Sequence, residues 1–230
     1  MAITFVAAGA WTQSASANIT PPMPAGIATN DILILVANGG FSTVPAQWTL
    51  LFSWLGENTN NVYWLRYDGS QTAQAVTWSA GNMSARVFAF RGCVTSGVPS
   101  SANNGNDLVA ATTAFTVGAI TVASGSAVVY GAFVIGGSSS TTRYSGWSTT
   151  KTGAMTELGD NTNLTGSVTS IGLAWGLAPS AGSTGTQVCT VSGASPGDTI
   201  IFDLLAAGAV VPIPQLPRMV RQAVARAASY

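Results

Sequence analysis

The chain of 230 residues carries eight basic and eight acidic residues and no histidine, so its formal net charge is zero. Charged residues make up 7% of it and hydrophobic residues 47%, against about 25% charged residues in an ordinary soluble protein. Zero net charge argues against a nucleic-acid partner, and the hydrophobic content argues against disorder. Because no window approaches about 18 continuous apolar residues, we expect no membrane span.

The first strongly predicted element is the aliphatic run Ile32 to Ala37. Asn30 and Asp31 precede it and Asn38, Gly39 and Gly40 follow it. A short β-branched run between turn residues is typical of a strand buried on both faces. The pattern recurs from Ala127 to Ile135, which is preceded by a Ser/Gly turn and followed by Gly136 and Gly137. Two central strands predict two similar halves.

Shorter apolar segments separated by turns follow each central strand. The predicted strands are, in the first half, 48–54, 62–67, 75–78 and 84–91, and in the second half, 155–158, 170–177, 186–191 and 198–205. Aligning the halves pairs Trp48 with Trp147, Trp64 with Trp175 and Phe88 with Phe202. We expect turns at 68–70 and 159–163, and a weakly structured stretch at 97–107. Strands at such spacings predict an all-β fold, a two-sheet jelly-roll-like sandwich over residues 1–208.

The C-terminal residues 209–230 differ in character from the rest of the chain. Pro212, Pro214 and Pro217 predict an extended linker, and Pro217 is suited to the first position of a helix. The predicted short helix is amphipathic, and its two faces supply the protein-docking residues Leu216, Arg218, Met219, Val220, Arg221, Val224 and Arg226. Either this helix packs on its own sandwich or the linker carries it to a neighbouring subunit, and the linker length favours the second alternative.

No residue pattern predicts catalysis. Without histidine, Ser-His-Asp and Cys-His mechanisms and His-ligated metals are excluded. Glu57 and Glu157 lie at roughly corresponding places beside polar turns, where solvated carboxylates are a better interpretation than a glycosidase pair. The Asn/Asp-rich stretches 103–107 and 159–163 lack the alternating acidic pattern of a calcium loop. We therefore predict a non-enzymatic protein with no cofactor and no metal.

The cysteines and the N-terminal residues suggest the compartment. The segment from Met1 to Val6 lacks the positive charge that begins a secretory signal, so we expect synthesis and retention in a cytoplasm. In that reducing environment Cys93 and Cys189 are predicted to be buried free thiols.

Seven tryptophans raise the alternative of sugar binding. Trp64, Trp78 and Trp175 lie inside apolar strands and are predicted to be core residues. The tryptophans near loops are the candidates for ligand contact, namely Trp11, Trp48, Trp54 and Trp147. Of these, Trp54 and Trp147 are the residues that we select for a test of glycan contact.

Four segments together resemble a recurrent module of tailed-bacteriophage virion proteins. They are 24–35 (PAGIATNDILIL), 47–51 (QWTLL), 62–70 (VYWLRYDGS) and 84–92 (SARVFAFRG), and the resemblance covers roughly residues 19–208. Proteins with this module are capsid decoration, minor tail or head-fibre components. The resemblance implies a virion structural protein, assembled in the host bacterial cytoplasm, whose partners are other virion proteins.

Within that class we favour a capsid decoration or cement protein that docks through its C-terminal arm. The alternatives are a minor tail, baseplate or head-fibre component, or a carbohydrate-binding module that attaches to a host surface glycan. The resemblance also implies a homo-oligomer, with a trimer as the common form, although no residue of this sequence requires that number.

Overall fold

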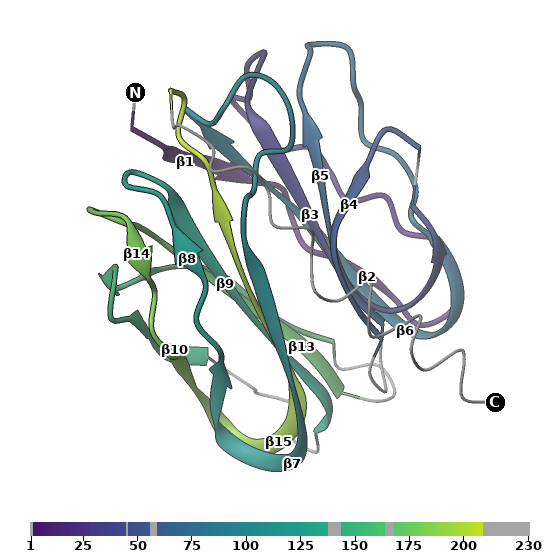
Figure 1. Ribbon diagram of the computed structural model, residues 1–230. Coiled ribbons are helices and arrows are strands. Elements are labelled where there is room, and N and C mark those ends of the chain that lie inside the picture. Colours follow the sequence, from purple (N-terminus) through teal and green to yellow (C-terminus); the bar gives the residue numbers. More distant parts are fainter. Residues whose placement is uncertain (1, 45, 56–58, 138–143, 164–167, 209–230) are drawn as a thin grey trace, which may run out of the picture.

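The computed structural model describes residues 2–44, 46–55, 59–137, 144–163 and 168–208, and every regular element within these ranges is a β-strand (Figure 1). The strands form two large sheets that lie face to face, which confirms the all-β, sandwich-like prediction. The proposed linker and C-terminal helix fall in 209–230 and lie outside the described residues.

The first sheet is built from residues 4–91. Its order is β1-β6-β3-β5-β4, and β2 also pairs with β6. The strands are β1 (Thr4–Ala8), β2 (Thr12–Ser14), β3 (Ile32–Thr43), β4 (Thr49–Leu55), β5 (Thr59–Arg66) and β6 (Thr77–Arg91).

The second sheet is built from residues 103–204. Its order is β11-β10-β15-β9-β13-β12, and β7 pairs with β15. The strands are β7 (Asn103–Val117), β9 (Ala127–Gly137), β10 (Tyr144–Thr149), β11 (Gly153–Ala154), β12 (Thr156–Asn163), β13 (Val168–Leu177) and β15 (Gln187–Leu204). A small separate sheet joins β8 (Thr121–Val122) to β14 (Gly182–Ser183).

The two halves share one strand order. The order β1-β6-β3-β5-β4 in the first sheet corresponds to β7-β15-β9-β13-β12 in the second. In β3, Ile34 lies opposite Trp64 and Phe88. Val129 of β9 lies opposite Trp175 and Phe202 in the same way. The predicted correspondence of Trp64 with Trp175 and of Phe88 with Phe202 is therefore confirmed by the register of the sheets.

The third predicted correspondence, Trp48 with Trp147, is wrong. Thr49 lies opposite Trp64, and Thr156 lies opposite Trp175. The counterpart of Trp48 is therefore Met155, the residue just before Thr156. Trp147 instead lies in β10, which is not part of the shared five-strand order. The prediction aligned the two tryptophans because they are the same residue type. The strand pairing shows that they do not occupy equivalent positions.

The strand order also differs from the predicted jelly roll. Each half supplies a whole sheet, so the chain crosses from one layer to the other between β6 and β7. Two Greek keys of a jelly roll would instead distribute the strands of each half over both layers. A central strand can therefore be buried on both faces even when each half of the chain forms its own sheet.

Two further local predictions need correction. The Asn-rich stretch 103–107 is the start of β7, and 159–163 is the end of β12. Both were predicted as loops because Asn, Asp and Gly favour turns, but ladder pairing with β15 and β13 holds them extended. The predicted turn at 68–70 is confirmed, since Gly69 has φ +98 and the Ser70 amide donates to Asp68 Oδ1 at 2.8 Å.

The main core lies between the two sheets. Alternation along β3 directs Ile32, Ile34 and Val36 toward the second sheet, and alternation along β9 directs Val129 and Phe133 toward the first. Aromatic rings cross this layer, with Phe90 and Trp175 in an edge-to-face contact at 5.8 Å between ring centroids. Because both halves contribute to one core, neither sheet covers its inner face without the other.

Polar side chains close one end of this core. Asn38 donates to Asn60 at 2.6 Å, and Asn60 donates across the layer to Asp198 of the other half. All three side chains are buried. A buried amide and carboxylate pairing of this kind fixes how the two sheets align, because a slip would leave polar groups without partners.

The outer faces of both sheets are also partly buried, in two different ways. On the first sheet, Leu33, Leu35 and Ala37 are covered by Ile19, Met23, Ile27 and Val76 from the connecting segments. On the second sheet, β7 and β15 bend together, as the lower end of Figure 1 shows, and carry Phe115 and Cys189 over Tyr130. The register of β15 against β7 shifts at this bend, between Thr190 and Gly197.

The connection between the halves is anchored by Asp203. Its buried carboxylate accepts hydrogen bonds from the backbone N–H groups of Ser101 and Ala102 and from the hydroxyls of Ser100 and Ser101, at 2.7 to 3.0 Å. Four donors compensate the cost of burying this carboxylate. The segment that enters the second half is thereby held against β15.

Because the inter-sheet core is shared, Phe88→Ala and Phe202→Ala should each destabilise the whole protein by about 3–5 kcal/mol, in one cooperative transition. The measurement is urea unfolding followed by both fluorescence and circular dichroism. Val109→Ala, at a side chain 75% exposed, is the control and should change stability by less than about 0.5 kcal/mol. Two separate transitions in either core variant would contradict a shared core.

Both cysteines are buried and free, as the sequence predicted. Burial raises the pKa of the Cys93 and Cys189 thiols to about 12, so almost no thiolate forms at about pH 8. A thiol-specific reagent at that pH should therefore label neither residue in the native protein and both in denaturant. Rapid labelling of the native chain, followed by mass spectrometry of its peptides, would show that one thiol is accessible.

Candidate functional site

The outer face of the first sheet holds a shallow depression beside a partly open apolar strip. A row of apolar side chains crosses this face through paired positions of four strands: Val87, Leu35, Tyr63 and Leu50. Val87 and Leu35 are buried, Tyr63 is half-buried and Leu50 is 51% exposed. The covering segments therefore protect β6 and β3 and leave the β5 and β4 side open to solvent.

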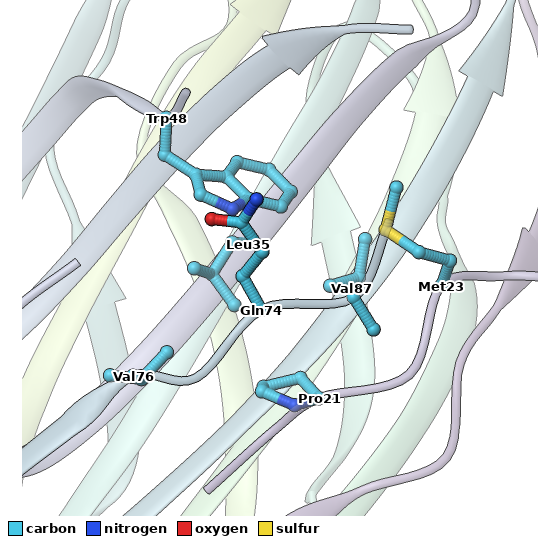
Figure 2. A pocket seen from close by; sticks show the side chains of 8 residues that line it. Pro21, Met23, Leu35, Trp48, Gln74, Val76 and Val87 are labelled. Atoms are coloured by element: carbon cyan, nitrogen blue, oxygen red, sulfur yellow. The ribbon is translucent and has the colours of Figure 1, made fainter. Parts of the chain in front are cut away.

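A shallow pocket lies where this cover ends (Figure 2). It is a surface depression without an enclosed space large enough for a water molecule, and four of its lining side chains, Pro21, Leu35, Val76 and Val87, are buried. Leu35 and Val87 belong to the sheet, while Trp48 precedes β4 and Gln74 precedes β6. The lining residues are Pro21, Met23, Leu35, Trp48, Ala73, Gln74, Val76 and Val87.

Local sequence explains why these side chains meet. Pro21, Pro22 and Pro24 keep the 19–27 segment out of the regular ladder, and a single bridge between Ile19 and Val76 pins it to the other covering segment. Trp48 comes two residues before Leu50, so strand alternation brings both to the outer face. Trp48 packs against the cluster around Leu35 and is half-buried.

Uncharged hydrogen-bonding groups surround the pocket. The Gln74 amide donates to Gln47 Oε1 at 3.1 Å, and Gln74 is exposed. Next to the pocket wall, Asn61 donates to the Tyr63 hydroxyl at 3.1 Å. Burial raises the pKa of the Tyr63 phenol, although the Asn61 hydrogen bond opposes this, so Tyr63 is neutral at physiological pH. None of the lining side chains carries a charge.

The two tryptophans selected from sequence do not form this site. Trp147 is only 5% exposed and packs edge-to-face on Tyr130, with ring centroids 5.0 Å apart. Its indole Nε1 donates to Glu157 at 3.0 Å, so the ring offers no open face for stacking. Trp54 lies in β4, and the placement of its side chain is outside the description. The residues around the pocket that sequence analysis overlooked are Gln47, Tyr63 and Gln74.

The remaining predicted site residues are not brought together by the described fold. Leu216, Arg218, Met219, Val220, Arg221, Val224 and Arg226 lie in 209–230, and Glu57 lies in 56–58, outside the described ranges. Glu157 accepts a hydrogen bond from the Trp147 indole. Its counterpart in the first sheet is Leu50, because Leu50 follows Thr49, which lies opposite Trp64, and Glu157 follows Thr156, which lies opposite Trp175. In the described residues, no three His, Cys, Asp or Glu side chains form a metal-binding group.

The depression offers only a small surface for contact with another molecule. An indole and aliphatic side chains supply dispersion contacts, and amides at the rim supply donors and acceptors. Candidate surfaces of other kinds are less defined, although several large apolar side chains are exposed elsewhere: Val98, Val109, Leu177 and Val188.

Comparison with known proteins identifies no relative of this chain. Within the described ranges, no helix has the length and hydrophobicity needed to cross a membrane. No family model matches the chain, and neither a curated protein nor a solved structure is significantly similar to it.

Proposed function

We propose that this chain is a non-enzymatic structural protein of a tailed-bacteriophage virion, and specifically a capsid decoration protein. The virion class rests on the resemblance of residues 19–208 to modules of such proteins. The observation from the fold that carries the proposal is the way the few charged side chains are used. Asp31, Asp198 and Asp203 are buried, and Arg66 and Arg86 bind backbone carbonyls of connecting segments, whereas Asp68, Asp107 and Glu157 remain exposed.

Asp31 and Arg91 give the clearest case. Asp31 is buried and accepts from Arg91 Nε at 2.9 Å and from Nη2 at 2.7 Å. The Ala28 amide also donates to this carboxylate, at 2.8 Å. A bidentate pair supported by a backbone donor secures the entry to β3 and leaves the carboxylate unavailable at the surface.

Two other arginines among the described residues, Arg86 and Arg66, behave similarly. Arg86 donates to the carbonyls of Gly9 and Leu158, so it links the first half to the second. Its guanidinium also lies over the Trp11 ring at 5.2 Å. Arg66 donates to the carbonyls of Val94 and Gly97 in the connection between the halves. These cations hold segments of the chain together.

A body of this kind is suited to close packing against neighbouring subunits. Charged residues are depleted at the centres of protein interfaces, because burying a charge carries a desolvation cost. The exposed strands here present hydroxyl, amide and small apolar groups, as in β7, where Val109, Ala110, Ala111 and Thr113 are all exposed. The part of β7 from Val109 to Thr113 can be covered without burying a charge, although Asp107 of the same strand is exposed.

Within the proposal, the arm 209–230 docks the body to the particle. The sequence places three arginines in its last thirteen residues together with an apolar stripe. A helix of about a dozen residues is marginal alone, so it requires a surface to pack on. The homo-oligomer suggested by the virion resemblance would present several such arms at once and strengthen attachment through multivalency.

The first test is the copy number of the chain in purified particles, measured by quantitative mass spectrometry. A decoration protein is expected at a count comparable to that of the major capsid protein. A few copies per particle would instead favour a minor tail, baseplate or head-fibre component. Absence from particles would overturn the virion proposal.

The role of the arm is tested in the full-length chain. Replacing Met219, Val220 and Val224 together by Ser should reduce incorporation into particles at least about tenfold, since the apolar stripe is lost. Val98→Ser, at an exposed position of the connection between the halves, is the control and should be incorporated normally. Equal incorporation of both variants would show that the arm does not dock the protein.

A further inference from the structure

We propose that the outer edge of β4 pairs with the β4 strand of a second copy of this chain, so that the first sheets of two copies join into one continuous sheet. The two strands run antiparallel about a twofold axis. No sequence pattern indicated this surface. The pairing does not depend on the virion proposal, because it would form between free chains in solution.

β4 is an open edge of the first sheet. It is the last strand in the order β1-β6-β3-β5-β4 (Figure 1), and in the part of the chain that the structure describes its backbone is hydrogen-bonded to β5 alone. Such a strand leaves N–H and C=O groups on its outer side that can pair with another strand. Proteins usually protect an edge with charged residues, proline or a covering segment. β4, with the sequence TLLFSWL, contains no charged residue and no proline.

The corresponding strand of the second sheet, β12, is protected by charge. The two strands match closely, since the pairing shifts after Leu50 in β4 and after Glu157 in β12. Leu51 and Leu158, the residues at these shifts, both pack on the main core. The sequence of β12, TELGDNTN, nevertheless carries two carboxylates, Glu157 and Asp160, and Glu157 is exposed.

β12 is also flanked by β10. The Met155 amide, just before β12, donates to the Trp147 carbonyl at 3.0 Å, and the Tyr144 amide donates to the Asp160 carboxylate at 3.0 Å. Among the described residues, no strand takes the equivalent place beside β4. The duplicated fold therefore has charge and a neighbouring strand at one edge and neither at the matching edge. This contrast is the observation that carries the inference.

The edge strands on the opposite side of the sandwich are less suited to pairing. β1 has only two consecutive paired residues on each side of its register shift, which lies between Phe5 and Ala7. β7 exposes Asp107 within its regularly paired part. By comparison, residues 52–55 of β4 are paired consecutively with β5 and carry no charge.

The apolar row on the outer face explains why a second copy fits. Val87 and Leu35 are buried, Tyr63 is half-buried and Leu50 is 51% exposed, so the row is still open to water where it reaches the edge. Antiparallel pairing about a twofold axis perpendicular to the sheet keeps the outer faces of both copies on the same side. The second copy would therefore bring its own Leu50 and Tyr63 to this face and continue the row.

Charge and symmetry also favour self-pairing. Because β4 is uncharged, no like charges come to lie opposite each other in the pair. Each copy uses the same strand, so the contact is closed once two copies have joined. One strand from each copy forms a smaller contact than a standard interface of about 1,200–2,000 Å². We therefore expect a dissociation constant of about 1–100 µM.

The first test is sedimentation velocity of the full-length chain at about 1 to 200 µM, a range that spans the expected dissociation constant. We expect a concentration-dependent dimer. Leu50→Lys adds a charge at the edge of both copies and should weaken association at least about tenfold. Val98→Lys is the matched control, because it makes the same kind of change at a side chain 56% exposed in the connection between the halves, and it should associate normally.

The second test uses the unaltered chain, so it holds even if Leu50→Lys changes stability. Backbone hydrogen exchange is measured by mass spectrometry at the two ends of the same concentration range. The amides of residues 49–55 should exchange more slowly at high concentration, because pairing protects them. The amides of residues 156–163, in β12, should exchange at the same rate at both concentrations.

Three results would overturn the inference. The first is a chain that stays monomeric over the whole range. The second is a dimer that Leu50→Lys does not weaken and that leaves exchange in β4 unchanged, because the contact would then lie elsewhere. The third is protection of β4 in particles but not in the concentrated free chain, which would show that the pairing strand belongs to another protein.

Discussion

The structure depends on one apolar layer between two sheets that come from different halves of the chain. Ile34 and Val129 occupy equivalent central positions in it, each flanked by an aromatic residue from either neighbouring strand. Removal of these large side chains from water is the main favourable term. The two halves share a strand order. Each sheet covers the inner face of the other, so neither half has a complete core alone.

The same strands also bury their outer faces, and the two halves achieve this differently. The second sheet bends β7 and β15 over itself, whereas the first relies on irregular segments around Ile19 and Val76. An irregular cover ends where its segments end. The partly open strip at Trp48, Tyr63 and Leu50 follows from that difference.

Polar side chains act mainly within the body. Asp203 anchors the crossing between halves, Asp31 and Arg91 secure the entry to β3, and Asn38, Asn60 and Asp198 close one end of the core. With only 7% charged residues, few remain for the surface. A role in packing and recognition by neutral groups is consistent with this use of charge, whether the partner is a subunit or a sugar.

Local sequence was sufficient for the elements with the strongest patterns. The runs 32–37 and 127–135 are strands, because β-branched residues between turn residues leave little alternative. The equivalence of Trp64 and Trp175 followed from their positions in similar strands. Sequence patterns were misleading where turn-forming residues lie in segments that pair as strands. Asn-rich 103–107 and 159–163 are strands, because pairing with β15 and β13 outweighs the preference of Asn and Gly for turns.

The sequence by itself therefore determined the all-β class, the two central strands and the duplication, since each is written in short-range pattern or composition. Only the tertiary structure decided that each half forms a whole sheet, that Trp48 corresponds to Met155, and that Trp147 is buried. It also brought Gln47, Gln74 and Tyr63 to one face. These are long-range outcomes, because strand register and the path of the covering segments depend on contacts between residues far apart in the chain.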